Sequence, residues 1–222
     1  MSKSVILLSG GLDSLVSLGL SVKKYNVEMA LTFDYGQKSA KGEIEASRKI
    51  CEFYNINHKV IKLDFLKEIT HTALVSEVEV PVFESVKNES ESAKAVWVPN
   101  RNGLFLNIAG CFADAEGYDY IIIGANYEEG QTFPDNTADF IGKVNEEFKF
   151  STLKHPQVLA PLINLKKSDI VKAAIDNSIP LELVMSCYKN NEKHCGQCES
   201  CSRLKAALIQ NNDTYYINKL FN

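Results

Sequence analysis

The chain has 222 residues, and 45% of them are hydrophobic, which is ordinary for a globular protein and sufficient for a core. Lys and Arg number 24 against 28 Asp and Glu, and the net charge is −4. Because no basic block is present, a nucleic-acid surface is not indicated and a small-molecule substrate is favoured. No apolar run approaches the roughly 18 residues of a membrane helix, and no signal-like segment is present. We therefore expect a cytoplasmic protein, not attached to a membrane.

Strand and helix signals alternate along the chain. Short apolar runs bounded by turn residues predict strands, and apolar residues three and four positions apart predict helices. The alternation predicts a Rossmann-like α/β fold, in which helices cover both faces of a parallel sheet. In chain order we expect a strand at 5–8, a helix at 12–24, a strand at 27–33, a helix at 42–54, a strand at 57–63, a helix at 104–116, a strand at 120–124, a helix at 137–150, a strand at 158–160, and helices at 167–177 and 199–210.

The segments that follow the predicted strands carry most of the candidate binding residues. Ligands bind at the carboxyl ends of the strands in parallel sheets of this kind. We therefore expect Ser9–Ser14, Asp34–Gln37, Gly124–Asn126 and Pro161 to lie on one edge of the sheet.

The polar segment 70–99 interrupts the alternation. Long loops in compact domains are usually functional or disordered, so this segment is either an active-site lid or a plain surface insertion. We place a main α/β domain at 1–180 and a smaller C-terminal unit at 181–222.

The hexapeptide Ser9-Gly10-Gly11-Leu12-Asp13-Ser14 directly follows the first predicted strand. Two glycines let the backbone turn sharply and approach a ligand closely. The amides that open the next helix carry partial positive charge, which suits a phosphate chain. The Lys of the pattern G-x-x-x-x-G-K-[ST] is missing, so another mode of nucleotide binding is indicated. The alternative is an ordinary strand-to-helix turn capped by Asp13 or Ser14.

Four of the six cysteines are crowded into the motif Cys187-x₇-Cys195-x₂-Cys198-x₂-Cys201. In a cytosolic protein such crowding indicates a metal site rather than disulfides. Four thiolates at about 2.3 Å from one ion complete a tetrahedron with no open position, so we expect structural Zn²⁺. Gly196 would allow the turn between ligands. An iron–sulfur cluster, unligated cysteines, and His194 in place of one ligand are less favoured.

The hexapeptide resembles the PP-loop, S-G-G-x-D-S, of ATP pyrophosphatases, which split ATP between its α and β phosphates. The resemblance implies that the Gly10 and Gly11 amides and the Ser9 and Ser14 hydroxyls hold the pyrophosphate portion. Asp13 would hold Mg²⁺, because hard cations prefer oxygen ligands and phosphates. The implied ATP-binding residues are Leu8, Ser9, Gly10, Gly11, Leu12, Asp13, Ser14 and Asp34.

The PP-loop and the cysteine spacing together resemble the 7-cyano-7-deazaguanine synthase family over nearly the whole chain. The shorter matches are Asp34-Tyr35-Gly36-Gln37 (D-Y-G-Q), Val98–Asn102 (V-P-x-R-N), Ala160–Leu162 with Lys166–Ile170 (P-L-x-x-x-x-K-x-[ED]-I) and Ser186–Tyr188 (T-C-Y). Asn136 and Thr137 depart from the family pattern G-Y-P-D-C-R, which leaves the substrate contacts of that loop open. The implied fold is of the adenine nucleotide alpha-hydrolase type, with a small C-terminal zinc-binding subdomain.

The family's activity is ATP-dependent conversion of 7-carboxy-7-deazaguanine and ammonia to 7-cyano-7-deazaguanine (preQ0), through adenylated intermediates, in queuosine biosynthesis. The resemblance therefore implies an AMP-forming ligase with structural Zn²⁺, with Mg²⁺ and ATP, and a homodimer. The implied catalytic residues are Asp13, Lys167 and Arg101, and the implied substrate-binding residues are Gln37, Asn100, Arg101, Asn102, Phe133 and Asp135.

Each of these assignments has a structural alternative. Lys167 could be an ordinary lysine at the start of a helix, and Arg101 could form a surface ion pair. Asp34 and Gln37 could belong to a capped turn, and Phe133–Asp135 could form a type I turn around Pro134. The apolar stripe Leu204, Ala207 and Leu208 serves either a dimer or the chain's own core.

Two other functions use the same motifs. A PP-loop tRNA-modifying ligase of the thiolation type is one, although the acidic pI of about 5.6 and the missing basic stripe argue against it. A nucleotide sensor that binds ATP without turnover is the other.

Overall fold

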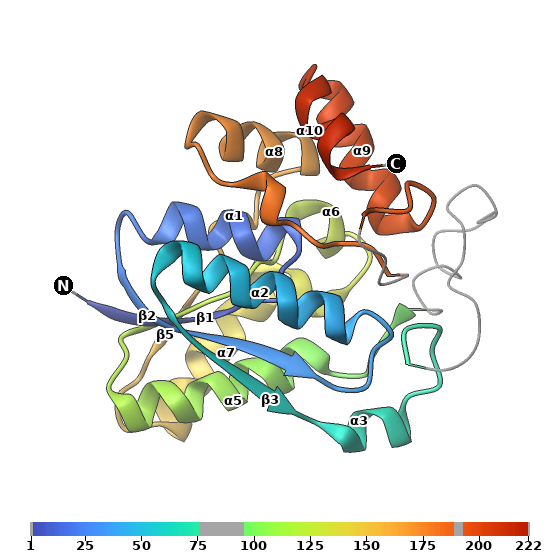
Figure 1. The fold of residues 1–222 in the computed structure, drawn as a ribbon. Helices are drawn as coiled ribbons and strands as arrows, with labels where there is room; N and C mark the ends of the chain where they lie inside the picture. The colour runs from blue at the N-terminus through green and yellow to red at the C-terminus, as the bar shows by residue number, and fades with distance from the viewer. Residues whose placement is uncertain (1, 76–95, 189–192, 222) are drawn as a thin grey trace.

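Five parallel strands in the order β3-β2-β1-β4-β5 form the central sheet of the computed structural model, which describes residues 2–75, 96–188 and 193–221 (Figure 1). They are β1 (Lys3–Leu7), β2 (Asn26–Asp34), β3 (Asn57–Lys62), β4 (Tyr120–Ile122) and β5 (Gln157–Leu159). The chain starts at the centre, runs to one side through β2 and β3, and then crosses to β4 on the other side. The strand order therefore reverses between β1 and β4, where sheets of this kind bind ligands.

Helices cover both faces of the sheet, as the fold prediction requires. α1 and α2 lie on one face and α5 lies on the other (Figure 1). The helices of the described residues are α1 (Leu12–Ser21), α2 (Ala40–Tyr54), α3 (Asp64–Ile69), α5 (Arg101–Glu116), α6 (Tyr127–Gly130), α7 (Ala138–Ser151), α8 (Lys167–Asp176), α9 (Glu199–Gln210) and α10 (Thr214–Leu220), with 3₁₀ turns η2 (Pro134–Asn136) and η3 (Leu181–Leu183).

Alternation along β1 divides the core into two apolar layers. Ile6 packs in one layer with residues of α1, α8 and α9. Val5 and Leu7 point to the opposite face and pack with residues of α5 and α7. All three side chains are buried, so β1 is buried on both faces, as expected of a central parallel strand. The predicted α/β fold class is confirmed.

The C-terminal helices pack on the side of the sheet that α1 occupies. Leu204, Ala207 and Leu208 of α9 are buried in the same core layer as Leu12 of α1 and Ile170 of α8. The apolar stripe of α9 therefore serves the chain's own core. The division at residue 180 stays a prediction.

The observed elements differ from the predicted ones mainly at their ends. α5 begins at Arg101, three residues before the predicted start, and Asn100 precedes it with a left-handed φ of 51°. The short helices α3, α6 and α10 have 6, 4 and 7 residues, too few to give a clear apolar period. The other two cysteines, Cys51 and Cys111, lie in helical patterns, which predict small core residues. Cys51 is buried, as predicted, but Cys111 is exposed, so the prediction for Cys111 is wrong.

Most of the predicted loop 70–99, namely 76–95, lies outside the described residues. Leu74, Val75 and Val98, at its described ends, are buried in the core layer of α5 and α7. Among the residues that the structure describes, no helix is both long enough and apolar enough to cross a membrane.

Gly10 occupies a backbone position that excludes a side chain. Its φ is +75°, and a Cβ atom there would lie 2.8 Å from Ala46 Cβ and 2.9 Å from Glu43 O, both on α2. We expect Gly10→Ala to lower the free energy of unfolding by about 2 kcal/mol, because it adds backbone strain and a clash. Urea denaturation measures this change.

The matched control is Gly142→Ala on α7, where an added Cβ would meet nothing within 4 Å. This change should raise stability by roughly 0.5–1 kcal/mol, because Ala favours the helix. Equal stabilities for the two variants would contradict the role assigned to Gly10.

Candidate active site

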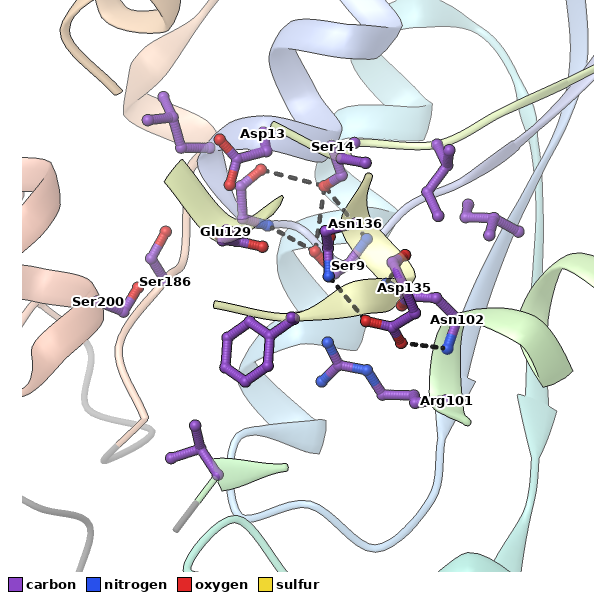
Figure 2. A pocket seen from close by; sticks show the side chains of 18 of the residues that line it. Ser9, Asp13, Ser14, Arg101, Asn102, Glu129, Asp135, Asn136, Ser186 and Ser200 are labelled. Atoms are coloured by element: carbon purple, nitrogen blue, oxygen red, sulfur yellow. Dashed lines mark hydrogen bonds between the residues drawn. The ribbon is translucent and has the colours of Figure 1, made fainter. Parts of the chain in front are cut away.

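A cavity of about 850 Å³ opens at the carboxyl ends of β1 and β4 (Figure 2). The segment 9–14, hereafter the phosphate loop, forms one wall through all of its residues except Gly10, together with Gly124 and Ala125. The other walls come from Tyr35, 96–98, the start of α5, α6, the segment 131–136, Lys167, 185–188 and the start of α9. Six residues predicted to share this edge are not part of the lining: Gly10, Asp34, Gly36, Gln37, Asn126 and Pro161.

Hydrogen bonds within the phosphate loop fix its shape. The Ser14 hydroxyl donates to Gly11 O (3.1 Å) and accepts the Ser9 N–H (3.2 Å). Ser9 Oγ lies 3.2 Å from Ser14 Oγ and accepts the Gly11 N–H (3.3 Å). Because Ser14 Oγ already donates to Gly11, the Ser9 hydroxyl is the donor to Ser14. The first three amides of α1 have no partner within their own helix and remain available to an anion.

A lysine and two carboxylates meet beside the phosphate loop. Lys167 Nζ, at the start of α8, pairs with Asp13 of α1 and lies 2.9 Å from Glu129 Oε1 of α6. Burial raises the pKa of Asp13 to about 6, against the lowering effect of the Lys167 ammonium group. The two carboxylates outweigh burial at Lys167 and hold its pKa above the ordinary value, so it is a cation at neutral pH.

The same group of residues offers ligands for a hard cation. Asp13 Oδ1 is buried and has no hydrogen-bond partner in the described part of the chain, although such atoms are normally satisfied. Glu129 lies across Lys167 from it. An orphaned carboxylate oxygen and a second carboxylate at a phosphate site suit Mg²⁺, which binds one or two carboxylates together with substrate phosphates.

Arg101 faces the cavity from the first position of α5 (Figure 2). Its guanidinium lies 3.4 Å from the Tyr35 hydroxyl, and no carboxylate of the described residues forms an ion pair with it. The other cations of the lining, Lys167 and Arg203, are both paired with carboxylates. Among the described residues, Arg101 is therefore the lining cation without a carboxylate partner, and it is placed to bind an anionic ligand.

Asp135 joins η2 to the start of α5. Its carboxylate accepts the Asn102 N–H (3.3 Å) and the Asn136 side-chain amide (3.0 Å), and its carbonyl accepts from the Asn102 side chain (3.1 Å). Burial raises the pKa of Asp135, and the positive charge of Arg101 opposes that rise. Asn136, which departs from the family pattern, thus has a definite partner here.

Two aromatic rings line the same cavity as Asp135. Phe133 and Trp97 are stacked with centroids 5.7 Å apart and planes at 11°, and both line the cavity. Aromatic faces of this size bind flat heterocycles by stacking.

Four predicted site residues, Gln37, Asp34, Asn100 and Gly10, are not part of the lining and have structural positions instead. Gln37 is buried: it accepts the Tyr35 N–H (2.9 Å) and donates to Phe33 O (3.0 Å) and Glu43 (2.9 Å). The Asp34 carboxylate accepts the Gly36 N–H (3.2 Å), as in a capped turn. Asn100 is the N-cap residue of α5, and Gly10 faces α2.

The four predicted metal ligands converge. The Sγ atoms of Cys187, Cys195, Cys198 and Cys201 all lie within 4.8 Å of one another, and Cys195 and Cys201 are 3.9 Å apart. A tetrahedron with Zn–S bonds of about 2.3 Å has edges of about 3.8 Å, so the cluster fits a structural zinc. The positive φ of Gly196, 71°, makes the expected turn. His194 is occupied elsewhere, because its Nε2 accepts the Ser186 N–H (3.0 Å).

Sequence reasoning missed Glu128, Glu129, Arg203 and Trp97. The two glutamates follow the end of β4, where a ligand-binding edge was expected, and that position was the available signal. Arg203 and Trp97 gave no signal of their own, because they enter the site only through packing of α9 and of the segment before α5.

A sequence model of the family described as "Queuosine biosynthesis protein QueC" matches residues 3–212. The chain is 49% identical over 215 residues to the 7-cyano-7-deazaguanine synthase of Methanosarcina barkeri and 50% identical over 215 residues to that of Methanosarcina mazei. Both alignments span 93% of this chain and 93% of the relative.

The fold is also similar to a solved structure described as "Crystal structure of a 4-thiouridine synthetase - RNA complex with bound ATP". The TM-score is 0.53 at 19% identity, over 96% of this chain and 51% of that one, so the likeness concerns the fold. With half of its residues shared with named synthases over nearly its full length, the chain belongs to the queuosine biosynthesis QueC family.

Proposed function

We propose that this protein is a 7-cyano-7-deazaguanine synthase, which uses ATP to convert 7-carboxy-7-deazaguanine and ammonia to the nitrile, with release of AMP and pyrophosphate. The observation that carries the proposal is the cavity itself. It combines a preformed phosphate loop with an Asp13 oxygen and an Arg101 guanidinium that have no hydrogen-bond partner and no carboxylate partner, respectively, among the described residues, in a chain of this family.

The need for ATP follows from the substrate. A carboxylate is a poor acyl donor, because an oxide or hydroxide would have to leave. Attack of a carboxylate oxygen on the α-phosphorus breaks the bond to pyrophosphate and leaves an acyl adenylate. Ammonia then adds to the carbonyl carbon, loses a proton and expels AMP, which gives the amide. The amide oxygen attacks a second ATP in the same way, and loss of AMP and of the amide protons gives the nitrile.

The phosphate loop and Lys167 provide charge neutralisation for both adenylations. The amides at the start of α1 and the hydroxyls of Ser9 and Ser14 are placed to bind the pyrophosphate portion. Asp13 and Glu129 would hold Mg²⁺, which when bound neutralises charge on the phosphates. The Lys167 ammonium group, which pairs with both carboxylates in this structure, adds a second positive charge beside the phosphate loop.

The opposite wall suits the deazaguanine acid. Arg101 can bind the carboxylate through two parallel N–H donors. Phe133 and Trp97 offer ring faces, and Asp135 offers acceptor oxygens for the donor edge of a guanine-like ring. The reaction needs no covalent enzyme intermediate, so positioning of carboxylate and α-phosphorus is the main task of these residues.

The four-cysteine cluster is proposed to hold one Zn²⁺ with a structural role, since four thiolates leave no position for a substrate. A homodimer is also part of the proposal. The tRNA-modifying alternative is not favoured, because the named relatives at half identity are nitrile-forming synthases. A sensor is distinguished by turnover: it would bind ATP without releasing AMP.

The first prediction concerns Asp13. Asp13→Asn should lower kcat/KM for the complete reaction by about 100-fold or more, because it removes a metal-binding and charge-bearing oxygen. AMP and pyrophosphate release, with mass spectrometry of the nitrile, measure the change. The far-ultraviolet circular dichroism should be unchanged, and an unfolded variant would point to a structural role instead.

No AMP release by the wild-type protein with the acid, ammonium and Mg-ATP all present, and with ATP bound, would favour the sensor over the synthase.

The second prediction concerns Arg101. Arg101→Gln should weaken binding of the deazaguanine acid by about tenfold to a hundredfold, because charged hydrogen bonds of this kind contribute ~1.5–3 kcal/mol. Trp97 is the single tryptophan and lines the cavity, so its fluorescence reports binding directly.

The nitrile product, which lacks the carboxylate, is the matched ligand control. Its dissociation constant should change less than threefold in Arg101→Gln. Equal weakening of acid and nitrile would show that Arg101 does not recognise the carboxylate.

A further inference from the structure

The segment that enters the cysteine cluster is hydrogen-bonded to the phosphate loop. Met185 N–H donates to Gly10 O at 2.8 Å. A Cβ atom on Gly11 would lie 3.7 Å from Ser186 Oγ, so the next residue also lies against the loop. Cys187, the first cluster cysteine, follows directly. Only one residue, Ser186, separates a loop-bonded amide from a cluster thiol.

His194 fixes this segment from the other side of the cluster. Its ring Nε2 accepts the Ser186 backbone N–H at 3.0 Å, and the backbone N–H of His194 donates to Leu220 O at 3.0 Å. The side chain is buried, with 1% of its surface exposed, and its ring packs against Phe221 at 5.2 Å between centroids. Cys195 is the next residue.

A second connection runs through α9. Cys198 is its N-cap residue and Cys201 lies in its first turn, so the cluster fixes the start of this helix. Arg203 of α9 pairs with Glu199 (2.9 Å) and Glu128 (3.6 Å). Glu128 in turn accepts the Lys167 N–H at 2.8 Å.

These contacts place the cluster next to the ATP site. Figure 2 shows Ser186 and Ser200, from the two connections, on the side of the cavity away from Arg101. Residues beside three of the four cysteines therefore line the cavity. Displacement of the cluster would move the segment at Met185 that supports the phosphate loop. It would also move α9, whose Arg203 pairs with Glu128, the acceptor of the Lys167 backbone N–H.

We propose that His194 is a positioning residue that couples the four-cysteine cluster to the phosphate loop, so that metal occupancy sets the affinity for ATP. The inference rests on the proposed function in one respect: ATP is taken as the ligand of the loop. The metal cluster is then more than an anchor for the C-terminal segment, because it holds the Met185–Gly10 hydrogen bond in place.

The test measures binding of a non-hydrolysable ATP analogue with Mg²⁺ by isothermal titration calorimetry. His194→Ala should weaken binding about tenfold, as for other residues that orient metal ligands and their surroundings. His194→Gln, whose Oε1 can accept the Ser186 N–H, should bind within about threefold of wild type. In turnover assays His194→Ala should raise KM for ATP while leaving kcat and KM for the acid nearly unchanged.

The control for general destabilisation is Val144→Ala, in the core layer on the opposite face of the sheet. It should lower thermal stability and leave analogue binding unchanged. Removal of the metal from wild-type protein with a chelator, checked by metal analysis and circular dichroism, should weaken binding as His194→Ala does. The measurement on metal-free wild-type protein tests the coupling even if His194→Ala does not fold.

Wild-type affinity in both His194→Ala and the metal-free protein overturns the coupling. Failure of the wild-type, metal-loaded protein to bind the analogue at all would instead overturn the proposed ATP-dependent function.

Discussion

One buried ammonium group, that of Lys167, holds the active site together. It balances Asp13 from α1 and Glu129 from α6, which would otherwise repel each other beside a binding site for phosphates. Removing Lys167 would leave both carboxylates without their cation, and breaking a buried ion pair in this way costs about 3–5 kcal/mol. The relative positions of α1, α6 and α8 therefore depend on this contact. The same contact keeps a cation ready at the phosphate loop.

The sequence predicted the fold and the four-cysteine cluster well, because both have strong local patterns. Alternating apolar runs gave the parallel sheet, and the cysteine spacing gave four thiols that converge. The phosphate loop was equally clear, because only glycine tolerates the φ and the close contact with α2 that Gly10 adopts. These features are decided by a few neighbouring residues.

The rest of the site is decided by contacts between distant segments, which a single sequence does not display. Gln37 lies in a family motif, but its side-chain amide is hydrogen-bonded to Tyr35, Phe33 and Glu43 and does not reach the cavity. Arg203 lies outside the motifs that match the family, yet it lines the cavity. Cys111 lies in the helical pattern of α5 but is exposed, and the apolar residues of this helix are not concentrated on one face. Whether each of these side chains reaches the cavity, the core or the solvent is decided by tertiary packing and not by its residue type.

The hydrogen bond between Met185 and Gly10 also has a consequence for synthesis of the chain. The phosphate loop leaves the ribosome long before the segment that supports it, because the two lie far apart in the sequence. Contacts so far apart in sequence form late, since loop closure must precede them. The strands and α1 can assemble during translation, but a supported ATP site must wait for the C-terminal helices. A nascent or C-terminally truncated chain should therefore carry the nucleotide-binding motif without its binding strength.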